Sequence, residues 1–393
     1  MSSARPMTGD IAGMTPLMAA FLLAVHTPAL ALGGNRFGLI LPTAAVVLAL
    51  LIRRASHLGP PRYASWLWLA VMAWGAMQIA TGLTPDPGQA ARIIARYALY
   101  ASVFLIAADF ARRPFQGGMM VRATAAWITL ICIYGLIAWS SGVNPIVAEL
   151  EAYAAPLEAS FVNRSAFALY AVFGLLASLT VLAGGRRGGG GFVGGGWLWA
   201  AAAMICGAAL ILTGSRGGLG AGVFGVIIFA AVSGGTRATA FVAVAVLIGA
   251  GLMGDAYFRD ASAFEDPRFA IHAQLLAETG NAPLLGHGLG AFQDAFRAPL
   301  GVDWRWGDWD HAHQQYLETA YELGWPAAIA LCLAIALAAP RPLRGDPITA
   351  LGLAALGAAA AHALVDFSLT IPSVAMTLAL LLGLGGGRQR RAS

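Results

Sequence analysis

Arg216 is the residue whose setting points most directly to chemistry. It occurs in TGSRGG, residues 213–218, between two apolar stretches. A guanidinium at the edge of an apolar stretch is costly unless an anion or a cavity receives it, and the neighbouring glycines let a ligand approach the backbone closely. The alternative is an arginine that snorkels to lipid headgroups. The pattern favours anion binding by Arg216, with Ser215 as a further candidate contact.

Arg268 is a second candidate for anion binding. It follows Asp266 and Pro267, which predict the N-cap and the first residue of a helix. Backbone N–H groups at a helix N-terminus favour an anion. A salt bridge from Arg268 to Glu265 or Asp266 would explain the same residues equally well.

His313 is the candidate general base. In WDHAHQQYLE, residues 309–318, Asp310 predicts a helix N-cap, and Gly324 predicts the end of that helix. His313 would then lie in the first turn, where a neutral imidazole can accept a proton, although a lone histidine is more often structural. Two neighbours are further candidate contacts to a substrate, His311 and Tyr316.

Two other polar pairs lie beside apolar stretches. Asn163 and Arg164 stand at the start of one stretch, where they could contact a sugar or a phosphate. His362 and Asp366 are four residues apart near the end of another, which predicts that they share one helical face and pair with each other. An ionisable pair at that depth marks a functional site or locks two helices together.

The elements that must position these residues are transmembrane helices. Of the 393 residues, 59% are hydrophobic and 11% are charged, whereas soluble domains carry roughly 25% charged residues. Apolar stretches long enough to cross a hydrocarbon core of about 30 Å recur along the chain. We therefore predict an all-α polytopic membrane protein with about twelve spans. These lie at residues 14–32, 37–52, 63–81, 92–110, 122–140, 166–183, 197–212, 218–233, 238–254, 326–340, 348–366 and 368–386.

The arginines orient these spans. With a cytoplasmic N-terminus, every segment predicted to lie inside carries arginine, whereas the short outside turns near residues 81–91 and 366–372 carry none. Both termini are therefore predicted to be cytoplasmic. The predicted division is residues 1–253 for the first nine spans, 254–325 for one large outer loop with catalytic elements, and 326–393 for the last three spans and a cytoplasmic tail.

Charge and cysteine usage argue against two other classes of protein. The net charge is +5, but the basic residues are dispersed in short loops between spans, so no nucleic-acid partner is expected. The sequence contains no CxxC pair and no Cys/His cluster, so we predict no metal site.

Four motifs, taken in order, resemble the O-antigen ligase and polymerase superfamily. They are TGSRGG at residues 213–218, PLLGHGLGAF at 283–292, AHQQYL at 312–317 followed by ELG, and HALVDFSLTIP at 362–372. The last motif is similar to the closing motif of the exopolysaccharide-polymerase branch. The resemblance covers roughly residues 161–384.

This resemblance implies a membrane glycosyltransferase of the GT-C type that needs no metal and no other cofactor. Such an enzyme takes its glycan from polyprenyl (undecaprenyl) diphosphate at the periplasmic face of the bacterial inner membrane. By resemblance, Arg216 and Arg268 match the conserved arginines and His313 matches the conserved histidine. The chain departs from the commoner HNDYL sequence at Gln314 and Gln315, so the resemblance assigns these two residues no contact to the acceptor.

Chemistry and resemblance agree on one mechanistic hypothesis. The two guanidinium groups would stabilise the departing diphosphate, while His313 takes the proton of the acceptor hydroxyl and the anomeric configuration inverts. Three acceptors stay open, namely a growing glycan, lipid A core and a protein hydroxyl, and the closing motif favours the growing glycan. The expected partners are these substrates and membrane lipids. A flippase for the same lipid-linked sugar is the rival, although the sequence shows no two pseudo-symmetric halves.

Overall fold

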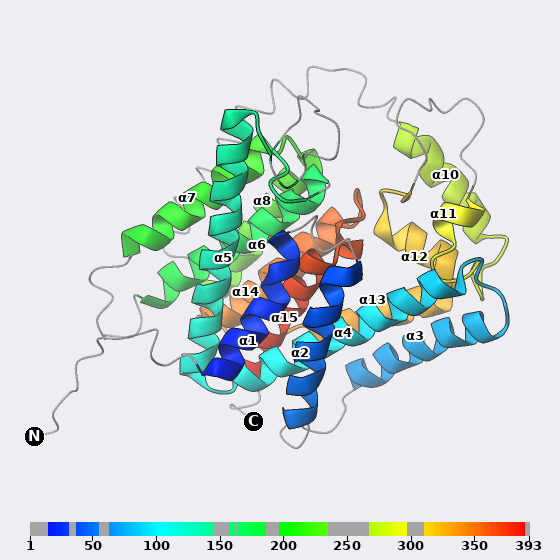
Figure 1. Cartoon of the computed structure of the whole chain (residues 1–393), viewed down its shortest axis with the longest axis horizontal. Helices are drawn as coiled ribbons and strands as arrows, with labels where there is room; N and C mark the ends of the chain where they lie inside the picture. The colour runs from blue at the N-terminus through cyan, green and yellow to red at the C-terminus, as the bar shows by residue number, and fades with distance from the viewer. Residues whose placement is uncertain are drawn as a thin grey trace, which may run out of the picture.

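The computed structural model is helical throughout the part of the chain that it describes (Figure 1). The described residues are 15–30, 37–54, 63–144, 146, 157–161, 163–185, 196–234, 267–296 and 310–389, and no strand occurs within them. The first helices are α1 (Pro16–His26), the 3-10 helix η1 (Thr27–Leu30), α2 (Phe37–Arg54), α3 (Tyr63–Ala80), α4 (Pro87–Ala111), α5 (Pro114–Ser141), α6 (Arg164–Gly185), α7 (Gly196–Leu212) and α8 (Arg216–Ser233). They are followed by α10 (Pro267–Thr279), α11 (Phe292–Ala295), α12 (Gln315–Leu323), α13 (Trp325–Ala338), α14 (Pro347–His362), the 3-10 helix η6 (Ser368–Thr370) and α15 (Pro372–Gln389).

The helices agree with the predicted apolar stretches. The predicted span 238–254 lies outside the described residues, and each of the other eleven overlaps a helix. By length and composition, α4, α5, α6 and α8 can each cross a membrane, while α7, α13, α14 and the segment Pro16–Leu30 are shorter apolar helices. The all-helical prediction is therefore confirmed, and the number of spans stays a prediction.

Two of the helices begin at a proline whose preceding aspartate forms a cap. Asp86 accepts a hydrogen bond from the Gln89 N–H at 2.9 Å at the start of α4. Asp346 accepts one from the Thr349 N–H at 3.1 Å at the start of α14. In each case the cap satisfies a backbone donor that the helix itself leaves without a partner, and the proline supplies a preset φ.

The core of the molecule is built around α6, which packs against α5, α7, α8 and α14. Along most of its length the side chains of α6 are buried on every face. Close packing here depends on small residues, because a Cβ at Gly174 would lie 2.5 Å from Ile128 and 2.9 Å from the Cys206 sulfur. Small residues at helix contacts are the usual means of close packing in membranes, where lipid removes the hydrophobic drive for association.

A small helical unit that contains α10, α11 and α12 has its own apolar core. Its core residues are Ile271, Leu275, Phe292, Phe296, Ala312 and Tyr321. Gln78 of α3 holds this unit by donating to the Leu285 carbonyl at 2.6 Å and accepting from the Leu289 N–H at 3.1 Å. Figure 1 shows the unit at the end of the molecule where α3, α4 and α13 meet. These two hydrogen bonds fix residues 285 and 289 against α3, so the segments that follow them start from a fixed position.

Candidate active site

His313 lies two residues before the first residue of α12. Its backbone conformation rules out a start of this helix at or before His313. Its φ is +52°, in the left-handed region that side chains other than glycine rarely adopt. The predicted N-cap at Asp310 and the predicted first-turn position of His313 are therefore wrong. Gln314 is the cap, because its side-chain oxygen accepts from the Leu317 N–H at 2.7 Å.

The other two expectations for this helix have different outcomes. The Asp310 carboxylate accepts a hydrogen bond from the Gln293 side chain at 3.2 Å instead of capping α12. The predicted end of the helix at Gly324 is confirmed, since Gly324 is the C-cap with a φ of +78°. A glycine is favoured at such a position because it has no Cβ to oppose the left-handed backbone.

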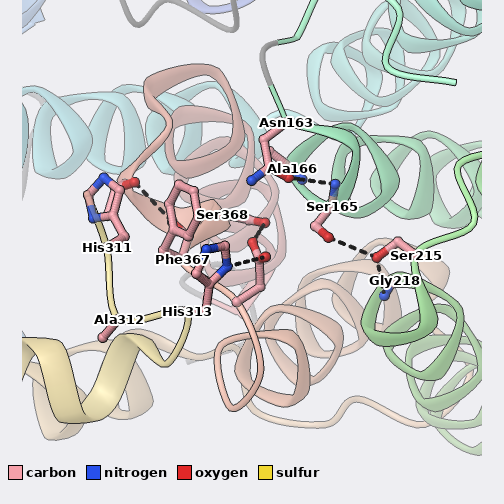
Figure 2. A network of polar contacts seen from close by, with 12 residues as sticks. Asn163, Ser165, Ala166, Ser215, Gly218, His311, Ala312, His313, Phe367 and Ser368 are labelled. Carbon is pink, nitrogen blue, oxygen red and sulfur yellow. Dashed lines mark hydrogen bonds and ion pairs between the residues drawn. The ribbon is translucent and has the colours of Figure 1, made fainter. Parts of the chain in front are cut away.

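A buried carboxylate faces His313. Oδ2 of Asp366 lies 3.7 Å from Nδ1 of His313, and the Asp366 side chain is only 4% exposed. The Ser368 hydroxyl donates to Oδ1 of the same carboxylate (Figure 2). Burial by itself would raise the pKa of Asp366, but its interactions with His313, His362 and Ser368 outweigh burial and hold that pKa below its ordinary value. Asp366 is therefore ionised at neutral pH.

A carboxylate at this position selects a histidine tautomer. An ionised Asp366 favours the proton on Nδ1 of His313, and this leaves the lone pair on Nε2 to accept a proton. The ring of Phe367 meets that of His313 edge-on, with 4.8 Å between centroids and 79° between planes. The imidazole is thus oriented by one charged and one aromatic neighbour from the same loop.

The predicted helical face shared by His362 and Asp366 does not form, although the two side chains still interact electrostatically. Helix α14 ends at His362, and residues 363–365 make a turn that carries Asp366 toward His313. The spacing of four residues predicts a shared face only while the helix continues. Both ring nitrogens of His362 are buried without a hydrogen-bond partner among the described residues.

Glu318 fixes the loop that carries His313, and sequence reasoning missed this role. One carboxylate oxygen accepts from Nδ1 of His311 at 2.7 Å and the other accepts from the Ala312 N–H at 2.7 Å. The Ala312 carbonyl lies 2.8 Å from Nε2 of His272 on α10. The two residues before His313 are therefore tied to α12 on one side and to α10 on the other.

Two pKa values in and beside α12 are raised, those of His311 and Glu322. Burial alone would lower the pKa of His311, but the charge of Glu318 and its hydrogen bond outweigh burial and raise that pKa. Burial, and then the charge of Glu318, raise the pKa of Glu322 to about 8. Glu318 and Glu322 are four residues apart in α12. That spacing, which puts two carboxylates on one helical face, is the signal that could have marked them.

Two helix N-termini with arginine at the first position lie next to each other. Asn163 accepts from the Ser165 and Ala166 N–H groups at 2.7 and 3.3 Å at the start of α6. Ser215 accepts from the Gly218 N–H at 3.1 Å at the start of α8. The hydroxyls of Ser165 and Ser215 lie 3.1 Å apart and join the two ends (Figure 2). The predicted substrate contacts Asn163 and Ser215 are thus helix caps.

The arginines that begin these helices, Arg164 and Arg216, are both exposed. Helix N-termini carry partial positive charge, so the two ends add to the charge of the two guanidinium groups. This combination favours a ligand with several anionic oxygens. The pairing of the two helix starts could not be read from the sequence, because 52 residues separate Arg164 from Arg216.

The start of α8 reaches the loop that holds Asp366. A Cβ at Gly217 would lie 2.7 Å from Val365 and 3.6 Å from the His362 ring. Glycine at this position lets the first turn of α8 lie directly on residues 362–365, one residue before Asp366. Figure 2 shows Ser215 and Ser165 on one side of Ser368 and His313 on the other.

The remaining predicted site residues are placed around this loop. Arg268 is the second residue of α10, one helical turn before His272, which contacts the backbone next to His313. The Tyr316 hydroxyl donates to the Ala360 carbonyl at 2.9 Å and so joins α12 to α14. The ring of His311 stacks on Phe367 with 4.3 Å between centroids. The start of α8, which carries Arg216, therefore packs on residues 362–365. Helix α10, which carries Arg268, contacts the backbone of Ala312 next to His313.

One comparison with known proteins covers part of the chain around this site. Residues 200–332 match the family model described as O-antigen ligase. The matched segment contains Arg216, Arg268 and His313, as well as Glu318. No curated protein matches the chain. The resemblance to the O-antigen ligase and polymerase superfamily is thereby confirmed for this segment. Together with the apolar helices, it supports a multi-pass membrane protein with a glycan transfer activity of the O-antigen ligase or polymerase type.

Proposed function

We propose that this protein is a metal-independent, inverting glycosyltransferase of the GT-C type in the bacterial inner membrane. It moves a glycan from polyprenyl (undecaprenyl) diphosphate to an acceptor hydroxyl at the periplasmic face, with both termini in the cytoplasm. The observation that carries this proposal is the pair of Asp366 and His313, at 3.7 Å, beside the arginine-bearing start of α8. His313 and the start of α8 lie within the segment that matches O-antigen ligase.

The donor diphosphate binds where positive charge is concentrated. Arg216 begins α8 and Arg268 stands at the second position of α10, so each guanidinium is next to a helix N-terminus. Arginine suits this task because it stays charged and binds phosphate oxygens in a fork. As the bond from the anomeric carbon to the diphosphate oxygen breaks, its electron pair moves to the diphosphate. Fixed positive groups stabilise that developing charge more than bulk water does.

His313 acts as the general base toward the acceptor. The acceptor oxygen attacks the anomeric carbon from the face opposite the leaving diphosphate, and its proton goes to Nε2 of His313. The imidazolium that forms is stabilised by the ionised carboxylate of Asp366 at 3.7 Å. One displacement with a base on the far side of the sugar inverts the anomeric configuration.

The acceptor is a growing glycan in our preferred version, so that the protein polymerises the repeat units of a surface polysaccharide. Residues 362–372, which are similar to the closing motif of the exopolysaccharide-polymerase branch, include Asp366 and Phe367 next to His313. That motif therefore supplies the carboxylate and the aromatic ring that orient His313, the proposed base. Ligation to lipid A core or transfer to a protein hydroxyl would use the same base and the same diphosphate site.

The deciding experiment is reconstitution of the purified protein in liposomes with a lipid-linked repeat unit. The proposal expects longer lipid-linked chains. Glycosylated lipid A core would instead identify a ligase, and a glycoprotein would identify an oligosaccharyltransferase. Movement of the lipid across the bilayer without a new glycosidic bond would instead establish a flippase. His313→Ala and Arg216→Ala should give no product at normal membrane levels. The exposed Arg344, in the turn before α14, provides the control Arg344→Ala, which should keep full turnover.

A further inference from the structure

A second basic site lies at the ends of α2 and α4, away from the His313 site. A pocket of about 320 Å³ opens beside the last turn of α2 and the turn between α4 and α5. It is lined by Leu17, Arg53, Arg54, Asp109, Arg112 and Arg113. We infer that this pocket binds the phosphate headgroup of an anionic phospholipid.

The charges that line this pocket are not balanced. The Asp109 carboxylate pairs directly with Arg54 and also lies 3.6 Å from Arg112. Arg53 and Arg113 are exposed at the rim. Among the described residues that line the pocket, one carboxylate therefore stands against four guanidinium groups. An anion with several oxygens would balance this positive charge.

Arg54 is held in place and still has a donor to offer. Its guanidinium lies 4.0 Å from the centroid of the Phe110 ring, and its ion pair with Asp109 fixes the opposite side. The Nε of Arg54 is buried and has no hydrogen-bond partner among the described residues. A buried N–H without a partner is costly unless a ligand satisfies it.

The position of the pocket fits the headgroup layer of a membrane. Helix α15 starts next to η6 and the Asp366 loop, and it ends beside α4, where a Cβ at Gly387 would lie 2.8 Å from the Ala111 Cβ. A helix of 18 residues spans about 27 Å at about 1.5 Å per residue, which is close to a hydrocarbon core of about 30 Å. The length of α15, which runs from the Asp366 loop to the end of α4 next to the pocket, is thus close to one membrane thickness.

The surroundings of the pocket favour a lipid over a free phosphate. Ile52, next to Arg53, is 69% exposed, and Phe115, two residues after Arg113, is 45% exposed. Exposed apolar side chains so near the arginines in sequence offer contacts for the acyl chains of a lipid whose headgroup the arginines hold. Basic pockets between transmembrane helices are known receptors for anionic headgroups. The ligand that fits both features carries a phosphate and hydrocarbon together.

The test is native mass spectrometry of the purified protein titrated with phosphatidylglycerol or phosphatidylcholine. The wild-type protein should prefer phosphatidylglycerol, and Arg53→Gln with Arg113→Gln should weaken its binding by about thirtyfold, because each arginine near an anionic headgroup contributes about fivefold. Arg344→Gln removes an exposed arginine that does not line the pocket and should leave the preference intact.

Three results would overturn the inference: unchanged phosphatidylglycerol binding in the double variant, an equal loss in Arg344→Gln, or displacement of the lipid by inorganic phosphate at equal concentration. The last result would assign the pocket to a free phosphate. If the double variant extracts poorly, Arg113→Gln alone should show a loss of about fivefold in the same titration.

Discussion

Two aspartates with cationic partners, one at each end of the molecule, show what the choice of partner decides. Asp109 pairs with Arg54 and is shared with Arg112, and both partners carry a permanent charge. Asp366 faces His313, whose charge can change near neutral pH. The first carboxylate can only balance charge, whereas the second can support a proton transfer. In our proposals the same acidic residue type therefore serves binding in one region and chemistry in the other.

The neighbours of the two carboxylates extend this difference. Asp109 stands among arginines at the rim of a pocket, next to exposed apolar side chains. Asp366 is buried, and Ser368 and Phe367 fix the carboxylate and the ring that it faces. A binding site tolerates a partner that moves, but a base must be held at one position to accept its proton. We expect substitutions at Asp366 to lower mainly turnover and substitutions at Asp109 to lower mainly stability.

The largest expected effect is that of Asp366→Asn on turnover. An amide cannot stabilise the imidazolium and no longer selects the tautomer with a lone pair on Nε2, so we expect kcat to fall by about 10³-fold. The measurement is product formation by the reconstituted protein, with the melting temperature in detergent as a second readout. A variant that melts normally but turns over like the wild type would remove Asp366 from the mechanism.

The next largest effect is that of Asp109→Asn on stability. Loss of the carboxylate leaves Arg54 partly buried without its ion pair, which we expect to cost about 2 kcal/mol. This is less than for a fully buried pair, because Arg54 and Asp109 remain 17% and 9% exposed. Thermal unfolding in detergent measures the loss. At a permissive temperature, turnover should stay normal, and a fall in kcat comparable to that of Asp366→Asn would erase the distinction between the regions.

A smaller effect is expected from Glu318→Gln, because in the proposed mechanism Glu318 only positions the loop that carries His313. The amide has only one acceptor oxygen, so either His311 or the Ala312 N–H loses its hydrogen bond. Such a loss costs about 1–3 kcal/mol, and we expect kcat to fall by about tenfold while the KM for the donor stays constant. The neighbouring Thr319, which bonds only within α12, provides the control Thr319→Ala. A rise in the donor KM with normal kcat would contradict the positioning role.

The comparison also shows which features could be predicted from the sequence. The apolar helices were predictable because the length of an apolar run is a local property, and Arg216, Arg268 and His313 could be singled out by their motifs. The start of α12 was predicted wrongly, because the left-handed backbone of His313 is fixed by contacts of the preceding residues to Glu318 and α10. These contacts come from tertiary packing, which capping preferences do not include.

Pairings between distant segments were beyond the sequence for the same reason. Arg54 meets Asp109 only because α2 packs against α4, and Ser165 meets Ser215 only because α6 packs against α8. The spacing of His362 and Asp366 predicted a local pair, but the end of α14 redirected Asp366 to a residue 53 positions earlier in the chain. A local pattern is reliable only while its helix continues.

The smallest expected effect is a pH dependence of stability that arises from Glu322. Burial, and then the charge of Glu318, raise the pKa of Glu322 to about 8 in the folded protein, against an ordinary value of 4.5. Between these two values the folded state holds a proton that the unfolded chain has released, so the contribution of this group to stability is greatest at low pH and is lost as the pH rises toward about 8. Thermal unfolding at pH 5 and pH 8 should show this loss in the wild type, and Glu322→Gln, which cannot ionise, should show a smaller one. An equal pH dependence in both proteins would mean that Glu322 is already ionised in the folded state, and the carboxylates around His313 would then be charged together.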